Sequence, residues 1–262
     1  METVSHHGRR TAYEHVDRGG VGPTACYVHG SGGAREMWRA QRELTDRAPM
    51  VALDLSGHGD SADVDADPGY QALSAYADDV IAVAEETDAT VLVGASLGGA
   101  VALHVALERS FQPEAIVLTG TGARMGVLED LLEWLASDFE RAVEFLHGPG
   151  RLFADPDSNP DIRERSLETM LDTGQVVTRR DFLTCHRFDV RDDLEGVDVP
   201  TLLLYGDQDR LTPPWFHEYL AEEIPDARAV EIEGAAHRPM LERPAAFNEA
   251  LTTFFSELSA AQ

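Results

Sequence analysis

The chain has 262 residues, 43% of them hydrophobic, which is enough for one packed α/β domain with a large core and argues against disorder. Asp and Glu number 47 and Lys and Arg number 21, so the formal charge is −26, and every one of the 21 fixed cations is an arginine. This charge repels the phosphates of nucleic acids and the headgroups of anionic lipids, so we expect neither nucleic acid nor membrane as a partner.

The acidic residues are spread along the whole chain rather than gathered in one tail. Repulsion among them strains a folded protein at ordinary salt, whereas molar salt shortens the electrostatic screening length to about 3 Å. The composition is similar to that of proteins from a high-salt cytoplasm. We interpret it as a halophile-type adaptation of the surface that carries no information about a substrate.

Three features of the sequence bear on where the protein resides in the cell and on the state of its cysteines. It contains no apolar run of about 18 residues, the length that a membrane span requires. Its first residues, METVSHH, lack the basic-then-apolar pattern of a signal peptide, which predicts a cytoplasmic location. Cys26 and Cys185 are too few for a disulfide framework, and no spaced Cys/His set predicts zinc. We therefore expect two buried thiols and neither a metal nor a cofactor.

Short apolar segments alternate with amphipathic ones through the first 120 residues. The strands are predicted at residues 4–7, 10–16, 24–28, 50–53, 90–93 and 115–118. The helices between them are predicted at residues 34–46, 73–86 and 100–109. Such alternation predicts a mainly parallel sheet with helices on both faces, and ligands of these sheets bind at the carboxyl ends of the strands.

The alternation stops between residues 122 and 186, where only helical patterns occur. One amphipathic helix is predicted at 127–146, and two shorter ones at 162–171 and 180–186, after a loop rich in glycine, proline and aspartate. Strands then resume. They are predicted at 199–205 and 229–232, with helices at 214–223 and 244–258.

The sequence GASLG at residues 94–98 follows a predicted buried strand and precedes a predicted helix. It matches the pattern G-x-S-x-G, in which a sharp strand-to-helix turn presents a serine hydroxyl at the edge of a sheet. Glycines allow so tight a turn without a clash at Cβ. A hydroxyl is a weak nucleophile that needs exposure and an adjacent base, so Ser96 is the candidate nucleophile. The alternative is a turn that only packs a helix against the sheet.

Two later strand ends carry a candidate base and a candidate acid. His237 follows the last predicted strand, and a neutral imidazole there can take the proton of a serine near pH 7. The alternative for His237 is a surface-loop histidine. Asp209 follows the strand before it and can fix the tautomer of the imidazole, although Asp207 competes with it by position. The strand at 115–118 ends in TGTG and offers no carboxylate.

The sequence HGSGG at residues 29–33 follows another predicted strand and supplies backbone N–H groups. A carbonyl under attack develops negative charge on its oxygen and needs two preorganised donors, each worth about 3 kcal/mol. We expect this oxyanion hole to consist of the N–H of Leu97, directly after Ser96, and that of Ser31 or Gly32. A phosphate-binding loop is the competing interpretation, but the chain has no lysine to complete one.

The order Ser96, Asp209, His237, the HGSGG loop and the sequence DLSGHGDS at residues 54–61 together resemble the α/β-hydrolase superfamily. The likeness covers nearly the whole chain and is greatest to the branch of carboxylesterases, enol-lactonases and C–C-bond hydrolases, whose nucleophile turn often reads G-x-S-[LM]-G-G. Relatives that are epoxide hydrolases or haloalkane dehalogenases have aspartate in place of the serine, so their chemistry is not expected. The histidine motif departs slightly, with GAAH where the family usually has G-x-G-H.

The resemblance implies the α/β-hydrolase fold, in which a helical cap is inserted into the sheet-bearing core. Residues 1–121 and 187–262 would then form the core and residues 122–186 the cap, with Asp54 and His58 in a structural turn. Apolar cap residues are candidates for a substrate pocket, namely Leu131, Leu132, Trp134, Leu135, Phe139 and Phe145. For most of them the alternative is packing of the cap onto the core.

These observations predict a serine hydrolase that cleaves a carboxylic ester, a thioester or a lactone through a Ser-His-Asp triad and an acyl-enzyme. The expected substrate is a small molecule with an acyl or ring-bearing group. Two alternatives stay open: an acyltransferase or cofactor-free perhydrolase that uses the same triad, and a protein that binds a ligand in the pocket without catalysis. The sequence is compatible with a homo-oligomer.

Overall fold

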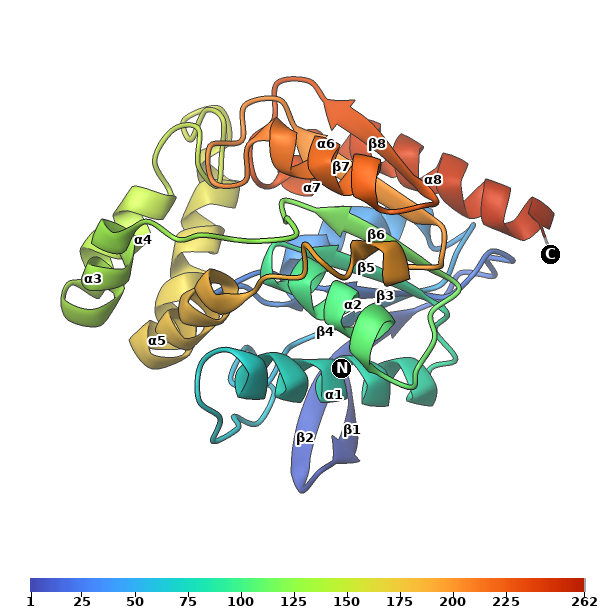
Figure 1. The fold of residues 1–262 in the computed structure, drawn as a ribbon, viewed down its shortest axis with the longest axis horizontal. Helices are drawn as coiled ribbons and strands as arrows, with labels where there is room; N and C mark the ends of the chain where they lie inside the picture. Colours follow the sequence, from blue (N-terminus) through green and yellow to red (C-terminus); the bar gives the residue numbers. More distant parts are fainter. Residues whose placement is uncertain (262) are drawn as a thin grey trace.

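Eight strands form one sheet in the computed structural model, which describes residues 1–261 (Figure 1). In the sheet they follow the order β1-β2-β4-β3-β5-β6-β7-β8. The strands are β1 (Glu2–His6), β2 (Arg9–Val16), β3 (Ala25–Val28), β4 (Met50–Leu53), β5 (Val91–Ala95), β6 (Ala115–Thr119), β7 (Thr201–Gly206) and β8 (Ala227–Ile232). The pairs β1–β2 and β2–β4 are antiparallel, and all other pairs are parallel. The prediction of a mainly parallel sheet is confirmed.

Helices cover both faces of this sheet (Figure 1). One face is covered by α1 (Tyr70–Glu86), α2 (Leu97–Glu108) and α6 (Pro214–Glu223), and the other by α8 (Pro244–Ala261) and a 3-10 helix, Arg35–Leu44. The short helix α7 (Pro239–Glu242) and a 3-10 turn, Leu194–Gly196, complete the core. Within residues 1–261, no helix is long and apolar enough to cross a membrane.

The two faces of the sheet are buried under separate apolar clusters. Along β5, Leu92 belongs to the cluster beneath α1 and α2, whereas Val91 and Val93 belong to the cluster beneath α8. This alternation follows from the two-residue period of a strand. All five residues of β5 are buried, which explains why its sequence is continuously apolar. The centre of the sheet is therefore a rigid support for the turn that follows β5.

Three helices, α3 (Glu129–Ser137), α4 (Phe139–Leu146) and α5 (Pro160–Arg187), lie together at one end of the molecule (Figure 1). The single helix predicted at 127–146 is divided between α3 and α4 because Asp138 leaves helical geometry and its side chain accepts the N–H of Arg141 as a cap. The two helices predicted at 162–171 and 180–186 are parts of α5, which bends at Gly174, where φ is 80°.

The helical segment predicted at 34–46 is a 3-10 helix. Its buried residues Trp38, Gln41 and Leu44 are spaced three apart, which places them on one face of a helix with three residues per turn. The side-chain amide of Gln41 donates to Oδ1 of Asn248 on α8 at 2.9 Å. The apolar residues indicated a helix here, but the tighter winding became visible only with the burial of the polar Gln41 between Trp38 and Leu44.

Candidate active site

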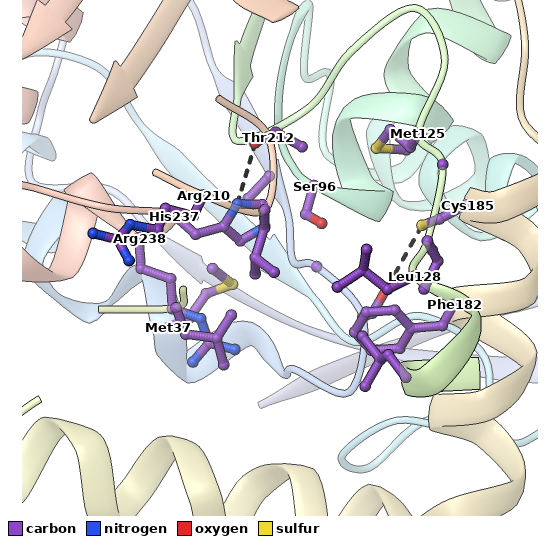
Figure 2. A pocket seen from close by; sticks show the side chains of 18 residues that line it. Met37, Ser96, Met125, Leu128, Phe182, Cys185, Arg210, Thr212, His237 and Arg238 are labelled. Atoms are coloured by element: carbon purple, nitrogen blue, oxygen red, sulfur yellow. Dashed lines mark hydrogen bonds between the residues drawn. The ribbon is translucent and has the colours of Figure 1, made fainter. Parts of the chain in front are cut away.

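The three residues of the predicted triad follow the carboxyl ends of three parallel strands. Ser96 comes directly after β5, Asp209 follows β7, and His237 follows β8. Parallel strands bring these ends to one edge of the sheet, where ligands of such sheets bind. Ser96 and His237 line the same cavity (Figure 2).

Ser96 occupies a strained turn between β5 and α2, with φ 53° and ψ −114°. A residue other than glycine rarely adopts a positive φ, and such outliers cluster at functional sites. The turn depends on glycine at two positions, because a Cβ on Gly94 would collide with the carbonyl of Gly98, and one on Gly98 would collide with the carbonyl of Val28. This turn therefore holds the half-buried Ser96 at the carboxyl end of β5, in the lining of the cavity.

His237 and Asp209 form a buried hydrogen-bonded pair. Nδ1 of His237 donates to Oδ2 of Asp209 at 2.8 Å, and the two residues are only 7% and 3% exposed. Thr212 stabilises the pair, since its hydroxyl donates to the same Oδ2 at 2.7 Å. Burial alone would raise the pKa of Asp209, but the attraction of His237 and the hydrogen bonds that it accepts hold that pKa below its ordinary value. Asp209 is therefore a carboxylate at neutral pH.

Asp207, which competed with Asp209 in the sequence, has a different partner. Its Oδ1 accepts the N–H of Gly234 at 2.7 Å, which fastens the turn after β8 to the turn after β7. Gly234 has φ 71°, so this turn requires glycine. The contact explains why two carboxylates follow β7: one fixes the loop that carries the histidine, and the other contacts the histidine.

The candidate oxyanion donors lie against Ser96. Gly30 is so close that a Cβ there would come within 3.0 Å of the Ser96 Cβ. Leu97 is the first residue of α2, where a helix leaves its N–H without an intrahelical partner. The N–H of Gly32 already donates to Oδ2 of Asp181 at 3.0 Å, so this group is occupied. Of the two alternatives for the second donor, Ser31 is therefore the one whose N–H has no hydrogen-bond acceptor among residues 1–261.

Asp181, on α5, is the centre of a buried polar cluster that the sequence did not reveal. Besides Gly32, it accepts Nε2 of His58 at 2.9 Å and the hydroxyl of Tyr76 at 2.6 Å. Burial opposes ionisation of Asp181, but the pairing with His58 outweighs it and lowers the carboxyl pKa, while the same contact raises the pKa of His58. The cluster joins the helix α5 to the glycine loop beside Ser96.

The cavity at Ser96 has a volume of about 160 Å³. Figure 2 shows His237, Arg238 and Met37 on one side of Ser96, and Leu128, Phe182 and Cys185 on the other. The lining is largely apolar, with the side chains of Met37, Met125, Val127, Leu128, Leu131, Leu152, Phe182 and Leu211. A cavity of about 150 Å³ in another protein takes a benzene-sized molecule, so the space suits a short or single-ring group.

The predicted pocket residues fall into two groups. Leu131 lines the cavity. The structure places Leu135 in the core cluster with no exposed area, and Trp134 edge-on against Phe145 at 5.1 Å between ring centroids. Phe139, Leu132 and Phe145 pack against the same cluster. Apart from Leu131, the predicted pocket residues therefore take part in packing and do not line the cavity.

Four residues of the site had only weak signals in the sequence or none. Arg238 is adjacent to His237, and Thr212 lies three positions after Asp209, so both could have been considered from proximity alone. Cys185 lines the cavity, and burial raises the pKa of its thiol to about 12, so it stays protonated. Asp181 had no signal, because only the packing of α5 brings it to the glycine loop. Among residues 1–261, no three His, Cys, Asp or Glu side chains are grouped as metal ligands would be.

The sheet, the strained serine turn and the buried histidine–aspartate pair define the architecture of an α/β hydrolase. The model of the alpha/beta hydrolase family matches residues 27–250. The chain belongs to this family, as predicted, and it is a hydrolase.

The relatives include several esterases. A pimeloyl-[acyl-carrier protein] methyl ester esterase of Neisseria meningitidis serogroup C is 34% identical over 236 residues, which are 84% of this chain and 88% of the relative. A solved thermophilic esterase is 31% identical with a TM-score of 0.84, covering 98% of this chain and 97% of that one. An enol-lactonase from Burkholderia xenovorans LB400 has a TM-score of 0.87 at 22% identity, covering 97% of this chain and 100% of that one, and it supports the fold.

Proposed function

We propose that this hydrolase is a serine esterase in which Ser96 is the nucleophile, His237 the general base and Asp209 the acid that orients the base. One observation carries the proposal: a strained serine turn and a buried His237–Asp209 pair face one cavity. The relatives named as esterases support the same reaction. Esters, thioesters and lactones share the carbonyl chemistry that this arrangement serves, and the size of the cavity favours a short or single-ring acyl group.

The proposed mechanism has two halves. Ser96 Oγ attacks the carbonyl carbon while Nε2 of His237 takes the hydroxyl proton, and the imidazolium is stabilised by Asp209. The N–H groups of Leu97 and Ser31 hold the oxyanion, and His237 gives the proton to the leaving alcohol or thiol. Water then loses a proton to His237 and attacks the acyl-enzyme, which releases the acid and restores Ser96.

The test is the variant Ser96→Ala, assayed with short p-nitrophenyl esters in molar salt. Removal of a serine nucleophile costs on the order of 10⁶-fold in kcat, so turnover should fall to background. The matched control is Ser5→Ala, on the exposed face of β1, which should leave kcat and KM unchanged. A fluorophosphonate should label the unmodified protein at Ser96. Retained turnover in Ser96→Ala, or absence of labelling, contradicts the proposal and favours a binding protein.

Acyl transfer is distinguished from hydrolysis by the products. With a competing alcohol, thiol or hydrogen peroxide present, an acyltransferase or a perhydrolase forms the corresponding ester, thioester or peracid in preference to the free acid. A hydrolase forms mainly the acid. We expect the acid, and a product ratio that follows the added nucleophile would contradict this expectation.

A further inference from the structure

The charged side chains that line the cavity at Ser96 are positive, whereas the net charge of the molecule is negative. The chain has 47 acidic residues and 21 arginines, yet within the described residues 1–261 no Asp or Glu lines this cavity. Besides His237, its charged lining residues are Arg210 and Arg238. Arg210 is exposed, whereas Arg238 is 7% exposed. A buried cation therefore lies beside the candidate base.

Arg238 is bound by neutral groups. Its Nη1 donates to the hydroxyl of Ser166, and that hydroxyl donates to Nε2 of His147 at 2.7 Å. Nδ1 of His147 in turn donates to the carbonyl of Val143 at 2.8 Å. Burial, aided by the nearby Arg238, lowers the pKa of His147 to about 4, so this ring is uncharged at neutral pH. This chain of hydrogen bonds through Ser166 and His147 orients the guanidinium of Arg238 but does not neutralise its charge.

Other largely buried arginines of this chain are paired with carboxylates. Arg9 pairs with Asp79, Arg35 with Asp54, and Arg180 with Asp63. In the described part of the chain Arg238 forms no such pair. The nearby Glu242 uses its two oxygens to accept the N–H groups of Ala154 and Ala236, each at 2.7 Å. Arg238 also borders a second hollow whose wall includes three acids, Glu36, Glu168 and Asp172, and none of the three forms an ion pair with it in the described part of the chain.

An unpaired buried charge is unfavourable, and proteins normally pair or remove it. Burial lowers the pKa of Arg238 to about 10, against the weaker attraction of Glu242, so the group is still a cation at neutral pH. Its position next to His237 places this cation in the wall of the reaction cavity. Among residues 1–261 no carboxylate forms an ion pair with this cation, so its charge is free to pair with an anion in the cavity.

We propose that Arg238 binds a carboxylate on the substrate, so that the preferred substrate is a short ester or lactone that also carries a free carboxylate. A guanidinium matches a carboxylate with two parallel charge-assisted hydrogen bonds. A cavity of about 160 Å³ restricts the separation of the two groups to a few bonds, as in a half-ester of a short dicarboxylic acid. This inference rests on the proposed esterase function and specifies its substrate class.

The experiment compares two esters of similar length, mono-p-nitrophenyl succinate, which is anionic, and p-nitrophenyl butyrate, which is neutral. The readout is the ratio of their kcat/KM values at fixed, molar salt. The unmodified protein should favour the succinate. Arg238→Met should lower the ratio by about 10- to 100-fold, the value of a hydrogen bond to a charged group, mainly through KM, and Arg238→Lys should recover part of it. Arg10→Met, an equal change of charge on the exposed part of β2, should not change the ratio.

A second measurement needs no variant and no turnover. Glutarate should bind the unmodified protein and raise its Tm, or inhibit ester hydrolysis competitively, at concentrations at which the neutral glutaramide does not. Equal effects of glutarate and glutaramide, or an unchanged ester ratio in a folded Arg238→Met, overturn the anion site while leaving the esterase intact. If neither ester is hydrolysed, the proposed esterase function is wrong. The comparison of glutarate with glutaramide then still tests whether Arg238 binds a carboxylate.

Discussion

At the scale of single residues, Asp209 divides its two oxygens between different tasks. Oδ1 accepts the backbone N–H groups of Leu211 at 2.7 Å and Thr212 at 3.0 Å, which fix the carboxylate in the loop. Oδ2 faces the Thr212 hydroxyl and Nδ1 of His237. The carboxylate is therefore held in position before it contacts the imidazole, and the orientation of His237 depends on one oxygen.

The variant Asp209→Asn should lower kcat by about 10⁴-fold. An asparagine can keep the contacts of Oδ1, but its NH₂ group would then face Nδ1 of His237. The imidazole would have to carry its proton on Nε2, where it can no longer accept the proton of Ser96. The measurement is kcat for a short p-nitrophenyl ester, with circular dichroism to show that the fold is intact.

The control for this variant is Asp207→Asn, two positions away. Asp207 contacts Gly234 and holds the turn, so its replacement should reduce Tm slightly and kcat by much less than that of Asp209. If Asp207→Asn instead lost as much activity as Asp209→Asn, the acid of the triad would have to be reassigned.

At the scale of elements, α5 is fastened to the core through Asp181 and His58. Both nitrogens of His58 face acceptors, since Nδ1 lies 3.2 Å from the carbonyl of Ser56 and Nε2 lies 2.9 Å from Asp181. A protonated ring satisfies both contacts as a donor. The pair is fully buried, and it lies below the loop that contains Ser31 and Gly32. Its strength should therefore depend on pH.

The stabilisation by this pair should be largest between about pH 4 and 6.5. The folded-state pKa of His58 lies above its ordinary value of 6.5, so this stabilisation is complete below 6.5 and is lost as pH rises through the folded pKa. The folded-state pKa of Asp181 lies below its ordinary value of 3.8. The stabilisation that its carboxylate contributes is therefore complete above pH 3.8 and is lost as pH falls through the lower folded-state pKa.

Urea unfolding of the unmodified protein and of Asp181→Asn across this pH range measures the effect. Loss of one partner of a buried pair costs about 3 kcal/mol, and the difference in unfolding free energy should shrink on both sides of the window. The matched control, Asp172→Asn, is exposed on the same helix and should show neither effect. A difference that does not vary with pH would mean that the two groups do not titrate as an ion pair.

The elements that the sequence predicted well are those fixed by local pattern. The turn at Ser96 could be predicted because GASLG between a buried strand and a helix is typical of a tight connection, and the strand ends indicated Asp209 and His237. The lining could not be predicted. The periodicity of α3 marks Leu131, Trp134 and Leu135 as apolar, but only tertiary packing decides that Leu131 faces the cavity and that Trp134 packs on Phe145. Arg238 likewise became informative only when its neighbours were known to be neutral.

At the scale of the whole molecule, the formal charge of −26 is distributed over the chain, while the largely apolar cavity at Ser96 has two arginines, Arg210 and Arg238, in its lining. A substrate with a free carboxylate, as proposed above, would approach a surface of its own sign before it meets Arg238. Salt screens the long-range repulsion at the surface, but it weakens contacts inside a buried site much less. High ionic strength should therefore ease the approach of an anionic substrate without abolishing its contact with Arg238.

The same charge predicts how stability responds to salt. Raising KCl from about 0.1 M to about 1 M shortens the screening length from about 10 Å to about 3 Å, which relieves repulsion among the surface carboxylates. Each 1 kcal/mol of relieved repulsion raises Tm by about 2–4 °C for a protein of this size, so at neutral pH Tm should rise by several degrees. Near the isoelectric point, about pH 4.5, the net charge vanishes, and the rise should largely disappear. A Tm that is insensitive to KCl at neutral pH, or that rises equally at both pH values, would show that surface repulsion does not limit the stability of this fold.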